Sequence, residues 1–237
     1  MPATALAQRT SPAVLRTLLT ERFPNAVLLP DRRLPVFPTG LAAFDRILPH
    51  GGLPRGRVTV WESSMGGGTA VLRSAVAASL GRGERVAWID GGQTLGPRWT
   101  DGPLIVRPRS ADLARKAAEI LLKCGGFGLV VLTGTPLDST IMLRLSRMVH
   151  EGGGAFVALA DAHHTAMVRV TSHYLRHPLQ TSVNPFGEIA AIDRIAIRIE
   201  ARSPGWHSHT VLEFPVRAHD LRLSLTPGVA DRRGDVD

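Results

Sequence analysis

The stretch Trp61-Glu62-Ser63-Ser64-Met65-Gly66-Gly67-Gly68-Thr69-Ala70 decides the fold. It follows a short β-branched run over residues 57–61, which predicts a buried strand. It leads into an Ala- and Leu-rich segment over residues 69–80, which predicts a helix that Gly81 ends. A strand, a glycine-rich loop and a helix in this order form the setting of a phosphate-binding loop.

This loop keeps the second glycine of a phosphate-binding loop but neither the first glycine nor the side chains that act on phosphate. The motif reads G-x-x-x-x-G-K-[ST]. When the chain is aligned on Gly68, Ser63 replaces the first glycine, Thr69 the lysine and Ala70 the magnesium-binding hydroxyl. We therefore expect the loop shape without the charge that grips the terminal phosphates. The residues of this degenerate nucleotide-binding loop are Ser63, Ser64, Met65, Gly66, Gly67, Gly68, Thr69 and Ala70.

The residues before the loop carry a more specific pattern. Thr39-Gly40 is followed by Asp45, and residues 51–57 read G-G-L-P-R-G-R. This order resembles the lead-in of the RecA family. Residues 85–90, ending at Asp90, resemble the second RecA strand. Residues 187–191, followed by an Ile-rich strand, resemble the RecA helix and strand after its second DNA-binding loop. The resemblance extends from about Leu34 to Arg202.

The departures from the RecA pattern agree with one another. The catalytic glutamate of RecA corresponds to Gly92, and the magnesium-binding aspartate that ends the Walker B strand corresponds to Thr133. The chain has only two lysines, Lys116 and Lys123, both on a later predicted helix, while Arg73 is expected to point away from the loop. ATP hydrolysis needs neutralised phosphates, a held magnesium ion and a positioned water. The resemblance therefore implies a pseudo-ATPase with no catalytic residue, cofactor or metal.

A RecA-like chain of this length without those residues resembles the ImuA family, RecA relatives that serve the bacterial translesion-synthesis mutasome in the SOS response. That resemblance implies a non-catalytic accessory protein that binds an ImuB-like polymerase homologue and RecA, and modulates recombination and damage-induced mutagenesis. Two alternatives stay open. One is a divergent DNA-dependent ATPase that holds nucleotide through backbone amides, and the other is a single-strand-binding recombination mediator without ATPase activity.

Composition indicates a globular protein with an anionic partner. Of the 237 residues, 44% are hydrophobic and 20% are charged, which is ordinary for a folded domain. The single cysteine, Cys124, excludes an intramolecular disulfide and fits a reducing cytoplasm, and the chain shows neither a membrane-spanning run nor a signal-peptide pattern. We therefore expect a cytoplasmic, nucleoid-associated protein. The formal charge of +8 favours weak binding of single-stranded DNA, although an arginine bias can also reflect genome base composition.

The expected fold class is α/β, a RecA-like P-loop fold. It has a mostly parallel twisted sheet with flanking helices, antiparallel C-terminal edge strands and an N-terminal helical extension. The expected divisions are a disordered segment 1–10, an N-terminal helix and linker 11–35, a RecA-like core 36–226 and a polar tail 227–237. The expected helices lie near 68–80, 111–123 and 139–150. The expected strands lie near 58–61, 86–90, 104–107, 129–132, 155–160, 194–201, 210–217 and 221–225.

Two further segments are candidates for contact with partners. The N-terminal helix carries an apolar stripe, which either docks on a partner such as RecA or folds back on its own core. Its residues are Val14, Leu15, Leu18, Leu19 and Phe23. Segment 176–187 occupies the place of the second DNA-binding loop of RecA. There Arg176, Asn184 and Phe186 are candidate DNA contacts, and an ordinary surface loop is the alternative.

The histidines near this segment suggest a metal site only weakly. His173 and His177 have the spacing of residues that share a helix face. A structural zinc site needs four well-placed ligands, and no cysteine accompanies these two. We therefore expect no metal.

Overall fold

The computed structural model describes residues 35–62, 66–95, 102–160, 166, 168–183, 186 and 189–215. All of them belong to residues 34–237, one of the two units into which the chain divides. The predicted N-terminal helix and the predicted strand at 221–225 lie outside the described residues.

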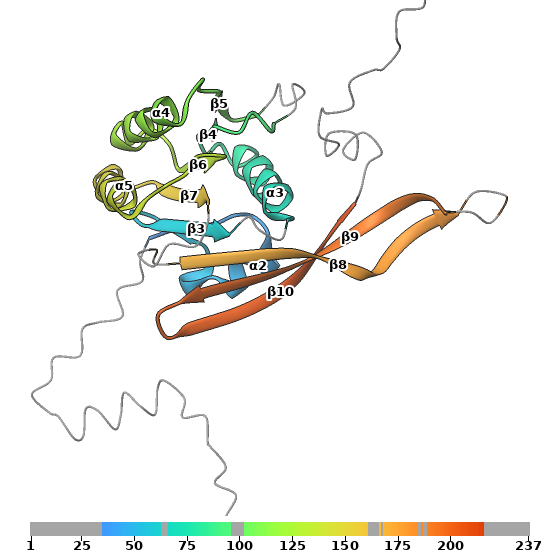
Figure 1. The fold of residues 1–237 in the computed structure, drawn as a ribbon. Coiled ribbons are helices and arrows are strands. Elements are labelled where there is room, and N and C mark those ends of the chain that lie inside the picture. The colour runs from blue at the N-terminus through green and yellow to red at the C-terminus, as the bar shows by residue number, and fades with distance from the viewer. Residues whose placement is uncertain are drawn as a thin grey trace, which may run out of the picture. The chain divides into compact units, whose positions relative to one another are not determined.

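An eight-stranded sheet forms the centre of this unit, in the order β10-β9-β8-β3-β7-β6-β4-β5 (Figure 1). Five strands form its parallel part: β3 (Val58–Glu62), β4 (Val86–Asp90), β5 (Leu104–Val106), β6 (Leu129–Thr133) and β7 (Ala155–Leu159). Strand β8 (Val168–Val183) runs parallel to β3. Strand β9 (Ile189–Ser203) pairs antiparallel with β8, and β10 (Trp206–Pro215) pairs antiparallel with β9. A small antiparallel pair, β1 (Val36–Phe37) and β2 (Leu53–Pro54), lies apart from the large sheet.

Within the described ranges, four α-helices accompany the strands: α2 (Ala42–Ile47), α3 (Gly68–Leu80), α4 (Ala111–Lys123) and α5 (Ser139–Gly152), with a 3₁₀ turn at Pro49–Gly51. Helices α4 and α5 begin at side-chain caps, since Ser110 accepts from the Leu113 amide and Asp138 from the Ile141 amide. Helix α3 has no side-chain cap and instead follows the N-cap residue Gly67, whose φ of 84° is left-handed. None of the helices in the described ranges is long and apolar enough to cross a membrane.

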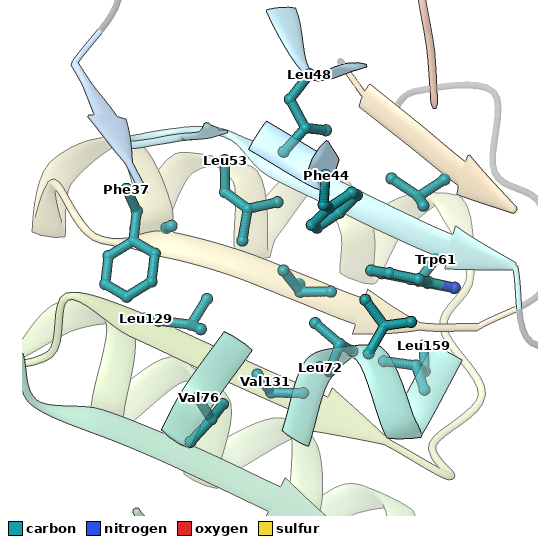
Figure 2. Packing of buried hydrophobic residues seen from close by; sticks show 14 of the residues in the cluster. Phe37, Phe44, Leu48, Leu53, Trp61, Leu72, Val76, Leu129, Val131 and Leu159 are labelled. Atoms are coloured by element: carbon teal, nitrogen blue, oxygen red, sulfur yellow. The ribbon is translucent and has the colours of Figure 1, made fainter. Parts of the chain in front are cut away.

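The core has two halves, one on each face of the sheet. Trp61, Trp88 and Val131 point to the face that α2 and α3 cover, and Figure 2 shows Trp61 among side chains that include Leu72 and Leu159. The alternate strand residues, among them Val60, pack against α4 and α5. Strands buried on both faces are the mark of a parallel sheet enclosed by helices. The predicted α/β fold class, with antiparallel strands at one edge, is therefore confirmed.

The region between β8 and β9 differs from the prediction. Strand β8 continues to Val183, so Arg176 lies in a strand rather than in a loop, and His173 and His177 share that strand and no helix. The RecA-like helix expected at 187–191 is also wrong from Ile189 onward, where β9 begins. The register between β8 and β9 shifts between Leu175 and Gln180. Such an irregularity interrupts the alternation by which a strand is recognised.

Candidate functional site

The glycine loop lies between β3 and α3, in the predicted order of elements. Gly66 and Gly67 both have positive φ, and α3 begins at Gly68. Thr69 is exposed and Ala70 is half-buried at the start of the helix. Ser63, Ser64 and Met65 lie outside the described residues. The described part of the loop thus presents a helix N-terminus without a basic side chain at the position of the motif lysine.

Side chains from three strands lie against the loop glycines. A Cβ at Gly66 would lie 2.7 Å from Cε2 of Tyr174, and one at Gly67 would lie 2.8 Å from Cγ2 of Ile197. A Cβ at Gly68 would lie 2.7 Å from Nε1 of Trp61. Tyr174 is on β8, Ile197 on β9 and Trp61 on β3. The three glycines are therefore required by packing within the protein itself.

A buried serine joins the loop to the sheet. Nε1 of Trp61 donates to Oγ of Ser172 over 2.9 Å, and that hydroxyl donates to the carbonyl oxygen of Gly66 over 2.8 Å. Ser172 is 1% exposed. The sequence analysis missed this residue. Its only local signal is that it continues the inward alternation of Val168 and Val170, both of them buried.

Thr133, which the sequence comparison predicts at the place of the magnesium-binding aspartate of RecA, is buried and hydrogen-bonded inside the protein. Oγ1 of Thr133 accepts from Nε1 of Trp88 over 3.3 Å and lies within reach of the Ile89 carbonyl. Asp90, at the end of the neighbouring strand, lies 3.5 Å from the same hydroxyl.

Asp90 itself is fully buried and holds the loop that follows β4. Its carboxylate oxygens accept from the amides of Thr94 and Leu95, each over 2.9 Å. Nε of Arg107 lies 3.8 Å from this carboxylate. The carboxylate thus acts as a cap for the backbone of its own loop.

The loops after β4 and β6 pack backbone to backbone. The amide of Gly91 donates to the Thr133 carbonyl over 2.9 Å. Gly134 has φ of +65°, and a Cβ there would lie 2.2 Å from the Gly92 amide nitrogen. Gly92, at the position of the catalytic glutamate, is exposed. A Cβ at Gly92 would meet Cα of Gly134 and Cγ2 of Thr94 at 3.4 Å, which is an ordinary van der Waals contact, so the backbone there carries no side chain although it could accommodate one.

The basic residues considered as substitutes for the loop lysine lie elsewhere. Lys116 and Lys123 are exposed on α4, which packs on the opposite face of the sheet from α3. Arg73 is half-buried one turn into α3 and has interactions of its own. Within the described ranges, no three His, Cys, Asp or Glu side chains are grouped so as to hold a metal ion.

The candidate DNA contacts are only partly described. Phe186, between β8 and β9, is 88% exposed, and Arg176 lies in β8. Asn184 lies outside the described residues. The proposed docking stripe from Val14 to Phe23 also lies outside them, so its role stays a prediction.

One face of strands β8, β9 and β10 is strongly basic. Arg169 pairs with Val60 and with Arg202, and Arg202 pairs with His207, so these residues share the sheet face that α4 and α5 cover farther along. Side chains of Arg194, Arg202 and His207 are more than half exposed. We call this surface the basic face. Its described basic members are Arg169, His173, Arg194, Arg198, Arg202, His207 and His209.

Glu200 lies in the middle of the basic face and organises it. Nη2 of Arg202 donates to this carboxylate over 3.2 Å, Arg198 lies 3.3 Å away and His207 3.6 Å. Partial burial by itself would raise the pKa of Glu200. The hydrogen bonds from Arg202 and His207 and the charges of Arg198 and Arg202 outweigh that effect and lower the pKa. The carboxylate therefore stays ionised and holds the surrounding cations in place.

Comparison with known proteins gives partial matches to RecA. No family model matches the chain. It is similar to Protein RecA of Frankia casuarinae (33% identical over 156 residues), of Mycobacterium marinum (32% over 149) and of Streptomyces avermitilis (30% over 155). These matches cover 60–62% of this chain but only 42%, 40% and 38% of the relatives' lengths. They support a RecA-like family for the chain, in agreement with its fold.

Proposed function

We propose that this RecA-like chain is a non-catalytic accessory protein of the bacterial translesion-synthesis mutasome. In this role it binds an ImuB-like polymerase homologue and RecA, and it modulates recombination and mutagenesis after DNA damage. The role places the protein in the cytoplasm, in association with the nucleoid. The support for it comes from the RecA-like fold, from the resemblance of the sequence to the ImuA family, and from the state of the site that hydrolyses ATP in RecA.

The observation that carries the proposal is that the described positions of the reactive groups are used for internal contacts. Thr133 accepts a hydrogen bond from Trp88 inside the protein, where a magnesium ligand would have to face a nucleotide. Gly92 lies against Gly134, where a glutamate would have to position water. Thr69 offers no charge to the phosphates. Because phosphoryl transfer depends on positioned charge, these groups supply little catalysis.

Two measurements on the full chain test this proposal. The first is steady-state phosphate release with magnesium, ATP and single-stranded DNA, where we expect no turnover above a protein-free blank. The second is capture of purified RecA, and of a purified ImuB-like protein, by the immobilised chain. Turnover that persists through purification and is lost in Thr69→Ala would favour the divergent ATPase instead. Absence of binding to both proteins would contradict the accessory role.

A second candidate function, single-strand binding without ATPase activity, is favoured by the basic face. Among the described residues of this face, four arginines outnumber two acids, Glu200 and Glu213, and such a surface is suited to bind a phosphate backbone. Arginines that replace counterions make binding fall steeply with salt. Tight binding of single-stranded DNA that persists at physiological salt would favour this mediator function over the accessory role.

A further inference from the structure

The ribbon formed by β8 and β9 extends beyond the rest of the sheet (Figure 1). The last pair between β3 and β8 joins Glu62 to Thr171, and the last pair between β10 and β9 joins Pro215 to Arg194. In the described sheet, residues 172–183 therefore pair only with β9, and residues 189–193 pair only with β8; we call these two segments the ribbon. An isolated two-stranded hairpin is marginally stable in water. The direction of the ribbon must therefore be set at its base.

We propose that the glycine loop is a latch that fixes the base of the ribbon, with Ser172 and Tyr174 as its positioning residues. Ser172 is the first residue after the last pair with β3. Its hydroxyl accepts from Trp61 on β3 and donates to Gly66 in the loop, so one buried group joins strand, ribbon and loop.

Strand β9 also contacts the loop in the same place, at the base of the ribbon. Tyr174 on β8 and Ile197 on β9 are directly paired across the two strands. Tyr174 lies against Gly66, and Ile197 lies against Gly67. The loop thus contacts a cross-strand pair, and it can do so only because neither loop residue has a Cβ.

These contacts change what the loop does. A phosphate-binding loop presents its backbone to a ligand, whereas the described part of this loop holds the protein's own strands. The ribbon that leads to the exposed Phe186 is therefore oriented by Ser172, Tyr174 and Ile197 without any ligand. This inference does not depend on which partner the chain binds, or on whether the site hydrolyses ATP.

Hydrogen–deuterium exchange on the full chain tests the latch. Ser172→Ala removes both hydrogen bonds, and Tyr174→Ala removes the ring that covers Gly66. In each variant we expect ribbon amides, followed in peptides from 174–183 and 189–195, to exchange about tenfold faster, as befits the loss of one or two buried contacts. Amides of β6 serve as the reference for global opening and should change much less.

Two matched variants serve as controls. Thr171→Ala removes the neighbouring hydroxyl on the opposite face of β8, and Tyr174→Phe keeps the ring; both should leave ribbon exchange within about twofold of the original protein. The latch is overturned if Ser172→Ala and Tyr174→Ala leave ribbon exchange unchanged, or if β6 accelerates equally in both. It is also overturned if the ribbon of the unaltered protein already exchanges as an unstructured peptide does.

Discussion

An aspartate at Thr133, the position that we propose for the lost magnesium ligand, should destabilise the protein. Thr133→Asp places a carboxyl group where the structure holds a buried hydroxyl that is hydrogen-bonded to Trp88. The neighbouring group is the fully buried carboxylate of Asp90, 3.5 Å from Oγ1 of Thr133. The change therefore brings two acids together at the ends of β4 and β6, with no described metal ligand set beside them.

The size of this destabilisation follows from the short distance between the introduced carboxyl group and that of Asp90. Two like charges 4 Å apart repel by about 4 kcal/mol at an effective dielectric constant near 20. The introduced carboxyl can avoid part of this cost by keeping its proton, which raises its pKa in the folded state. We therefore expect Thr133→Asp to lose about 2–4 kcal/mol of unfolding free energy at pH 7, relative to the uncharged isostere Thr133→Asn.

Urea unfolding of the two variants at pH 7 and at pH 5 measures this difference. The pKa of the introduced acid is higher in the folded than in the unfolded protein, so its full loss of unfolding free energy is present above the folded pKa. This loss declines as pH falls and is absent below the unfolded pKa of about 4. The gap between Thr133→Asp and Thr133→Asn should therefore narrow at pH 5. Equal stability of the two variants at pH 7 would refute the reasoning.

Four further changes have defined outcomes. Thr69→Lys, at an exposed position, should fold normally and still release no phosphate from ATP above the blank, since in the proposed pseudo-ATPase the positions of the magnesium ligand and of the water-positioning glutamate are Thr133 and Gly92; robust turnover would show a more complete site. Deleting residues 1–24 should weaken capture of RecA while the Tm of the core stays constant, and a lowered Tm with unchanged capture would assign that segment to the core. Arg198→Ala combined with Arg202→Ala should weaken the binding of single-stranded DNA and should flatten the slope of log Kobs against log salt concentration by about 1.4. The control Arg144→Ala on α5 should change neither the affinity nor the slope. Gly134→Ala should lower the free energy of unfolding, measured in urea, by about 2 kcal/mol more than Gly153→Ala does. Both glycines have left-handed φ, but only Gly134 faces the backbone of Gly92.

The parallel part of the fold was predictable because its signals are local. The apolar runs that became β3, β4, β6 and β7 are buried almost throughout, and α4 and α5 start at the side-chain caps Ser110 and Asp138. The position of the loop between Trp61 and Gly68 was predictable from the spacing of its glycines alone. Each of these signals lies within a dozen residues, so no tertiary contact had to be known.

The remaining features depend on contacts between distant residues. Trp61 and Ser172 are 111 positions apart, and nothing near either residue identifies the other. Strand β8 was overlooked although Val168 and Val170 alternate with polar residues, because Ser172 and Pro178 interrupt the apolar pattern. The partners of Thr133 were equally hidden, since Trp88 reaches it across a strand pair that sequence patterns do not specify.

Strand β3 joins the parallel and antiparallel parts of the sheet, since it pairs with β7 on one side and β8 on the other. During synthesis β3 emerges long before either neighbour, whereas β8, β9 and β10 are consecutive and can form their hairpins as soon as they appear. Closing such a long loop costs entropy before any contact compensates for it, so non-local pairing is slow. Until then both edges of a strand containing two valines and a tryptophan are unpaired and prone to association. The docking of β3 is thus the step that joins the two parts of the sheet, and until it occurs this strand is open to association with other chains.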